Sequence, residues 1–146
     1  MPLTRTPHWA TREFHQFLVA RAREPFAWGK NDCCLFVADA IQSFTGVDLA
    51  DDFRGKYSDE ASAFALIKSV TGGSTVADAA LHCAKTHGLH EWEHPLQAQR
   101  GDLVIVQNAG QIISGIVHLN GRTVAVVGPA GLKLIPIGNI ARSWHV

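Results

Sequence analysis

Two adjacent cysteines, Cys33 and Cys34, follow the run WGKND and begin a stretch with helical apolar spacing. Asn31 or Asp32 can cap this helix, so Cys33 lies in the first turn, where free backbone N–H groups and the positive end of the helix dipole favour a thiolate. A thiolate is the nucleophilic form of cysteine, and the same N–H groups can hold an oxyanion. A charged Asp32 opposes this by raising the thiol pKa. We interpret Cys33 as a candidate nucleophile, the alternative being a buried, inert cysteine.

The third cysteine, Cys83, makes the count odd. Adjacent cysteines rarely bridge each other because a vicinal disulfide strains the peptide between them. We therefore expect no disulfide framework and at least one free thiol.

A second cluster of possible ligands lies in one short stretch, and it consists of His82, Cys83, His87, His90 and His94. These side chains are typical zinc ligands, but the stretch has no CxxC pair and its histidines are not spaced four residues apart on a helix. We therefore favour solvated histidines near a helix end and expect no metal and no cofactor.

The elements that position these residues follow from the periodicity. Apolar residues at helical spacing predict helices over 11–24, 32–44, 58–70 and 75–87. After Pro95 the pattern changes to short apolar runs, which predict strands at GDLVIV, IISGIVHL, RTVAVVG and LKLIPI. Helices followed by a meander predict an α+β fold with a C-terminal antiparallel sheet.

Local signals set the expected ends of these elements. Ser58 is expected to cap the third helix, and Thr75 with Asp78 resembles a capping box for the fourth. Gly46 is a natural C-cap for the helix that contains Cys33. The dipeptide Asn120-Gly121 predicts a type I′ hairpin between two strands.

The composition excludes several classes of protein. The 146 residues match the length of one domain, which we place over 1–146, and 47% are hydrophobic, enough for one core. Basic and acidic residues are equal at 13 each, so no basic field favours nucleic acid. No apolar run reaches the roughly 20 residues that cross a bilayer, and the N-terminus has no signal-peptide pattern. We expect synthesis in a cytoplasm and no membrane insertion.

The string Trp28-Gly29-Lys30-Asn31-Asp32-Cys33 resembles the signature of NlpC-type cell-wall cysteine peptidases, and QRGDLV at 99–104 resembles their Pro-Gly-Asp-Leu-Val strand. The resemblance implies a papain-like core with Cys33 as the nucleophile. It also places Ile113 where the family has its catalytic histidine. His118 is the nearest substitute, and it would need a β-bulge near Gly115 to point toward Cys33.

Nearly the whole chain also resembles an uncharacterised group of NlpC-like proteins from phage and prophage tail modules, through WG…DC…F.ADAI, TG.D…RG.Y, Gly101-Asp102 and a terminal Trp-x-Val. This implies a structural or assembly role at a tail tip or baseplate, with altered or lost catalysis. Expected partners are other tail-tip proteins such as the hub and the distal tail protein, and the expected location is the virion tail. The alternative is an active peptidoglycan stem-peptide hydrolase that aids DNA entry.

Overall fold

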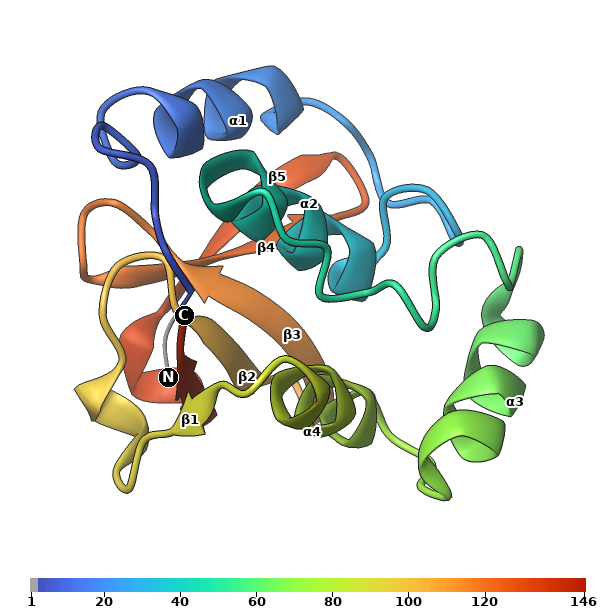
Figure 1. The fold of residues 1–146 in the computed structure, drawn as a ribbon. Coiled ribbons are helices and arrows are strands. Elements are labelled where there is room, and N and C mark those ends of the chain that lie inside the picture. Colours follow the sequence, from blue (N-terminus) through green and yellow to red (C-terminus); the bar gives the residue numbers. More distant parts are fainter. Residues whose placement is uncertain (1–2) are drawn as a thin grey trace.

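The computed structural model describes residues 3–146, which form four α-helices followed by a six-stranded antiparallel sheet (Figure 1). The helices are α1 (Glu13–Arg21), α2 (Cys33–Thr45), α3 (Glu60–Thr71) and α4 (Val76–Thr86). The helix-then-sheet order confirms the predicted α+β class. None of the helices in the described part of the chain is both long and apolar enough to cross a membrane.

The sheet has the strand order β1-β6-β2-β3-β4-β5. Its strands are β1 (His90–Glu91), β2 (Leu103–Asn108), β3 (Gln111–Val117), β4 (Thr123–Gly128), β5 (Gly131–Pro136) and β6 (Ile140–His145). Two short 3₁₀ helices, η1 (Pro95–Gln97) and η2 (Ile137–Asn139), lie between strands. The strands β1 and β6 were not predicted from the sequence, because neither has a run of apolar residues that marks it.

The predicted helix caps are largely confirmed. Asp32 caps α2 by accepting a hydrogen bond from the Leu35 N–H, and Gly46 ends the helix in the left-handed conformation. Thr75 and Asp78 form the capping box of α4. For α3 the prediction was wrong by one residue, since Asp59 and not Ser58 is the cap.

The predicted type I′ hairpin at Asn120-Gly121 is wrong, and one forms elsewhere. The side chain of Asn120 instead accepts hydrogen bonds from the N–H groups of Arg122 and Thr123, which builds a longer loop between β3 and β4. Ala109 and Gly110, between β2 and β3, both have the positive φ that a type I′ turn requires. An alanine at such a position gives no sequence signal, so periodicity and turn residues missed it.

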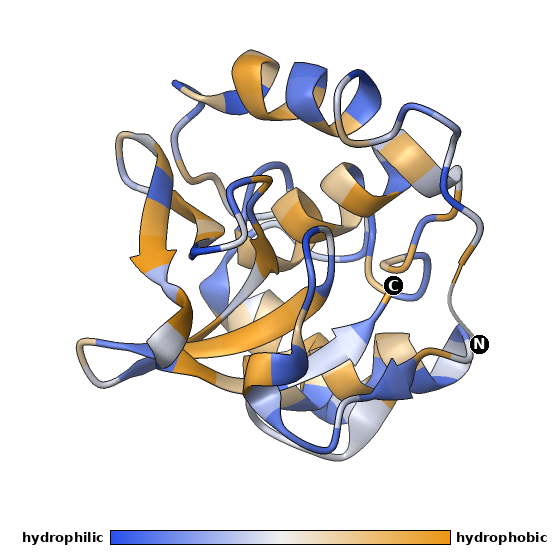
Figure 2. Cartoon of the chain, turned by 90° about the vertical axis from the view of Figure 1, so that its left-hand side faces the viewer, coloured by the Kyte–Doolittle hydropathy of each residue, from blue (hydrophilic) through white to orange (hydrophobic). Residues whose placement is uncertain are grey.

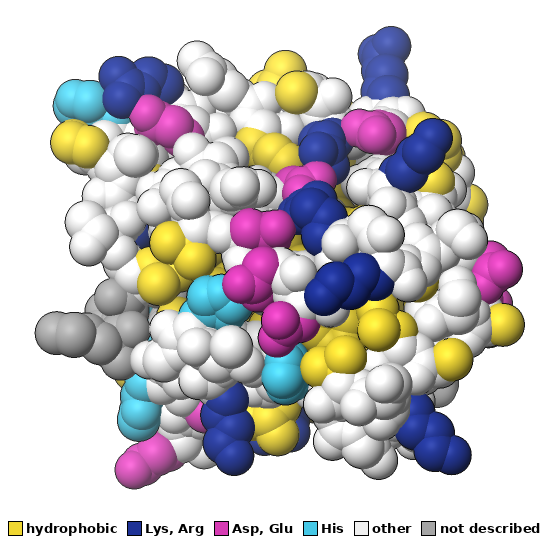
Figure 3. All heavy atoms as spheres, turned by 45° about the vertical axis from the view of Figure 1, so that its right-hand side comes forward, with side chains coloured by type: hydrophobic (Ala, Val, Ile, Leu, Met, Phe, Trp, Pro, Cys, Tyr) yellow, Lys and Arg dark blue, Asp and Glu magenta, His cyan; other side chains and the backbone are white. Residues whose placement is uncertain are grey.

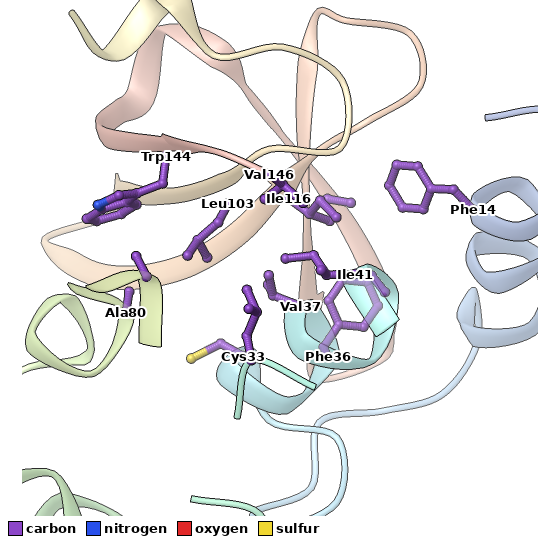
Figure 4. Packing of buried hydrophobic residues seen from close by; sticks show 14 of the residues in the cluster. Phe14, Cys33, Phe36, Val37, Ile41, Ala80, Leu103, Ile116, Trp144 and Val146 are labelled. Atoms are coloured by element: carbon purple, nitrogen blue, oxygen red, sulfur yellow. The ribbon is translucent and has the colours of Figure 1, made fainter. Parts of the chain in front are cut away.

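One hydrophobic core fills the space between the helices and the near face of the sheet. Its members include Phe14 of α1, Phe36 and Ile41 of α2, and Leu103 and Ile116 of the sheet (Figure 4). Hydrophobic residues accordingly concentrate on the strands and the inner helix, whereas the connecting loops are more hydrophilic (Figure 2). This packing fixes α2, and therefore Cys33, against the sheet.

A second apolar cluster lies on the other face of the sheet, and it contains Val104, Val106, Val117, Val124, Val126, Ile135 and Ile140. The register of β2 against β6 shifts between Ile105 and Val106, and such irregularities bend a strand. The sheet therefore buries its second face largely with its own strands. Alternate residues of β2 and β3 consequently point to different cores.

Candidate functional site

Cys33 is the first residue of α2 and lies at the edge of the main core (Figure 4). Its side chain is 8% exposed. The position confirms the predicted place of the thiol in the first helical turn, where free N–H groups and the helix dipole favour negative charge.

The turn before α2 is built around the buried carboxylate of Asp32. Besides the N–H of Leu35, it accepts hydrogen bonds from the Gly29 N–H at 3.0 Å and from the hydroxyl of Tyr57. Gly29 has a positive φ, and a Cβ there would lie 2.7 Å from the Tyr57 carbonyl oxygen. Glycine is therefore required for the close approach that brings Tyr57 to the site. Burial, with the Asp32 hydrogen bond, raises the pKa of Tyr57, so this hydroxyl acts as a donor.

Cys33 and Cys34 form a thiol pair with opposite titration behaviour. The hydrogen bond from Cys34, helped by the backbone and side chain of Ser114, lowers the pKa of Cys33. The same hydrogen bond and burial raise the pKa of Cys34. The charge of Asp32 does oppose ionisation of Cys33, as predicted, but it is outweighed. The pair therefore favours a thiolate on Cys33 and a neutral donor on Cys34.

The residue of β3 that faces these thiols is Ser114. Its hydroxyl donates to Cys34 Sγ at 3.9 Å, and it lies opposite Ile105, which belongs to the main core. Ile113, the position that the NlpC resemblance assigns to a catalytic histidine, instead packs against the second core. The side chain that contacts the cysteines from β3 is therefore a hydroxyl and not an imidazole.

The structure does not bring His118, the second predicted site residue, to Cys33. It follows the end of β3, where its N–H donates to the Thr123 carbonyl and its Nδ1 accepts from the Asn120 N–H. Four residues of strand separate it from Ser114, a distance of about 13 Å. No β-bulge at Gly115 shifts β3 against β2, since their register is continuous.

An apolar cavity of about 50 Å³ lies between α2, α3, α4 and the segment 47–57. Cys33, Cys34, Tyr57 and Ser114 line one part of it, and Phe53 and other apolar side chains line the rest. Its size suits a small aliphatic group.

A larger groove of about 720 Å³ lies on the outer side of Cys33. Phe26, Trp28 and Phe64 form its aromatic wall, and Trp28 packs edge-on against both phenylalanines. Trp28 thus packs against two aromatic neighbours and also lines the groove. Cys33 borders both hollows.

A network of ion pairs holds the segment 47–57 over the cavity. Arg54 binds Asp39 at 2.6 Å and Asp48 at 2.8 Å, and Arg21 of α1 binds Asp39 at 2.7 Å. Figure 3 shows basic, acidic and histidine side chains gathered near the middle of one face, with hydrophobic side chains beside them. These contacts tie α1, α2 and the segment that carries Tyr57 together.

The candidate metal ligands of the sequence lie with separate partners. His82 pairs with Asp52 at 2.8 Å, His87 pairs with Asp51, and the ring of His94 caps η1. Burial raises the pKa of Cys83 to about 12, which keeps it protonated. Within residues 3–146 no group of three or more such side chains is arranged to hold a metal ion.

Ser114 was not singled out in the sequence, and Tyr57 appeared there only as the last residue of the RG.Y string, with no role in the site. Tyr57 is 25 residues from Asp32, and nothing local links them. The alternation in IISGIV does carry a signal for Ser114, because a small polar residue stands there between apolar ones that must alternate between two faces.

Comparison with known proteins gives one relationship. No curated protein and no solved structure matches the chain. A family model described as a domain of unknown function, DUF6950, matches residues 4–146. That match covers nearly the whole chain, which therefore belongs to the DUF6950 family.

Proposed function

We propose that this protein is a structural or assembly component of a phage tail tip or baseplate, built on a papain-like, NlpC-type core with altered or lost catalysis. The resemblance of the sequence to tail-module proteins supports the location. Cys33 at the start of α2, packed against an antiparallel sheet whose β2 follows Gly101-Asp102, supports the NlpC-type core.

The observation that best supports a loss of catalysis is that Ser114, and not a histidine, contacts the thiol pair from β3. Hydrolysis by a cysteine enzyme needs a base that delivers protons to the leaving group and activates water. No histidine of the described chain lines either the cavity or the groove. Ser114 and Tyr57 are donors at neutral pH, so neither replaces an imidazole.

Immunogold labelling of purified particles from the source phage or prophage tests the location. We expect label at the tail end distal to the capsid, and tails that fail to assemble or to adsorb when the gene is deleted. Particles that lack the chain, together with normal tails in the deletion strain, would contradict the proposal. Complementation with Cys33→Ser should restore assembly, because the role does not depend on thiol chemistry.

The lowered pKa of Cys33 beside an open groove favours a second candidate, a cysteine hydrolase that cleaves peptidoglycan stem peptides. Mass spectrometry of muropeptides incubated with the purified protein tests it, with Cys33→Ser as the control. Cleavage by the native chain and not by the variant would establish this activity. The absence of cleavage products would leave the structural role as the supported function.

A further inference from the structure

The strands β3 and β4 pair along only a short part of their length. Within the described chain their ladder consists of Ile116 with Ala125 and Val117 with Val124, whereas β2 and β3 pair over six positions. Gly115 explains the divergence, because a Cβ there would lie 2.4 Å from Val124 Cγ1 and 2.9 Å from Val126 Cγ1. The valines of β4 pass over this glycine, and the first half of β3 is left outside the ladder.

The outer groove occupies the space beside this free part of β3. Ile112 and Ile113 of β3 line one side, and Val126 and Val127 of β4 line the other. Cys33 also lines the groove, and its sulfur accepts a hydrogen bond from the backbone of Ser114. The Cys33 thiol therefore takes the position, beside the backbone of Ser114, that a carbonyl oxygen of a neighbouring strand would occupy in a continuous sheet.

The register shows which backbone groups face the groove. The N–H of Val117 donates to the Asp102 carbonyl, and its C=O accepts from the Gly101 N–H, so the backbone polar groups of Val117 point toward the β2 side. Backbone polar groups alternate in direction along a strand, so the even-numbered residues of β3 point theirs away from β2. By this alternation, the N–H and C=O of Ile112 and the C=O of Ser114 point into the groove. Edges of this kind are templates for an added strand.

Two charged residues at the rim of the groove indicate what kind of extended segment could pair with the free part of β3. Glu60 at the start of α3 and Lys133 of β5 both line the groove and are exposed. Neither forms an ion pair with another described residue. An extended segment with apolar side chains at alternate positions, a basic residue near Glu60 and an acidic residue near Lys133 matches both the lining and the charges.

We propose that this groove binds a short extended segment of a partner protein, which adds to the free edge of β3 as a strand. The segment pairs with Ile112 and with the C=O of Ser114, and its apolar side chains pack against Trp28 and Ile112. This inference requires no catalysis and does not depend on where the protein acts. A failure of the tail role would therefore leave it standing, and the reverse also holds.

The test uses the purified chain and a capped peptide, Lys-Val-Thr-Val-Thr-Val-Glu, in a fluorescence or calorimetric titration. A second peptide carries N-methyl groups on alternate amides, which removes donors and keeps the side chains. Because two or more backbone hydrogen bonds are lost, we expect it to bind at least about tenfold more weakly. Equal binding of both peptides, or no binding of the first at about 1 mM, would overturn strand addition.

A substitution in β3 gives the matched test in the protein. Ile112→Pro removes an N–H that faces the groove but is not part of the β2 ladder, and Ile112→Val keeps it. Thermal unfolding establishes that both variants are folded, and amide exchange at Ile112 in the native chain and in Ile112→Val reports the pairing directly. We expect the peptide to slow exchange at Ile112 in the native chain, and Ile112→Pro to bind it at least about fivefold more weakly than Ile112→Val. Equal affinities, unchanged exchange, or a concentration-dependent dimer that Ile112→Pro abolishes would overturn the assignment to a partner segment.

Discussion

The hydroxyl of Ser114 on β3 donates to the sulfur of Cys34 on α2 at 3.9 Å, and this contact joins the sheet to the thiol pair. The neutral Cys34 in turn donates to Cys33. A chain of donors therefore ends on the first residue of the helix, where the helix dipole also favours negative charge. The reactivity of Cys33 should depend on each link in this chain.

We predict that iodoacetamide labels Cys33 at lower pH than an unfolded cysteine. The thiolate is the reactive form, and the pKa of Cys33 is lowered in the folded protein, so the rate should reach its plateau below the usual pKa of about 8.5. Peptide-resolved mass spectrometry over a pH series measures this. Cys83 is an internal control, because its pKa of about 12 should leave it almost unlabelled at pH 8.

Substitution of the hydrogen-bond donors Cys34 and Ser114 should raise the pKa of Cys33, and the two substitutions should differ in size in a fixed order. Cys34→Ala removes the largest stabilising hydrogen bond and should raise the pKa of Cys33 most, whereas Ser114→Ala should raise it less because the backbone contact of Ser114 remains. A Cys33 profile that is identical in Cys34→Ala and the native chain would contradict the donor chain.

Another prediction concerns the backbone of the turn before α2. Gly29→Ala should lower the free energy of unfolding by about 2 to 4 kcal/mol, because the residue has φ of +77° and its Cβ would meet the Tyr57 carbonyl oxygen at 2.7 Å. Gly46→Ala is the matched control, since its φ is +75° and no atom lies within 4 Å of the added Cβ. It should cost only about 1 to 2 kcal/mol, and chemical denaturation measures both. Equal losses would show that the approach of Tyr57 is not constrained.

The helices and their caps were predictable because their signals are local. Asp32, Gly46 and the pair Thr75–Asp78 act within four residues of the backbone groups that they satisfy. The class of the fold followed from the change of period after Pro95. The strand β6 was missed because IARSWH has no run of apolar residues, and its partners β1 and β2 lie far away in the chain and give no local signal.

The site was only half predictable, because local signals place Cys33 but long-range contacts bring its neighbours to it. The place of Cys33 followed from a cap and an apolar face. Its neighbours Tyr57 and Ser114 are 24 and 81 residues away, and they reach it through a glycine turn and the register of β3. The prediction of Ile113 at the histidine position rested on an alignment of short strings. A shift of one residue in a strand changes which face a side chain points to.

A further prediction concerns Asp102, which is fully buried and binds residues near both ends of the described chain. Its carboxylate accepts hydrogen bonds from Arg5 at 3.2 Å, from Trp92 Nε1 at 2.9 Å and from the Val146 N–H at 3.0 Å. Asp102→Ala leaves the part-buried Arg5 guanidinium with backbone carbonyls as its only hydrogen-bond partners among the described residues and removes the acceptor of Trp92 and Val146, so it should cost about 3 to 5 kcal/mol in unfolding free energy. Glu91→Ala breaks the exposed pair with Arg142 and should cost less than about 1 kcal/mol. Similar losses for both variants would show that the buried contacts of Asp102 stabilise the fold no more than an exposed ion pair does.

The last prediction separates the structural and electrostatic effects of Asp32. Asp32→Ala removes the α2 cap and leaves the Tyr57 hydroxyl and the Gly29 N–H without an acceptor, so it should cost about 2 to 4 kcal/mol. Asp32→Asn keeps an oxygen that can cap the helix but removes the negative charge beside the thiol pair. Since that charge raises the pKa of Cys33, its removal should lower the pKa further and speed labelling at pH 6. A slower reaction in Asp32→Asn, with the helix intact by circular dichroism, would show that Asp32 acts on Cys33 through the helix start and not through its charge.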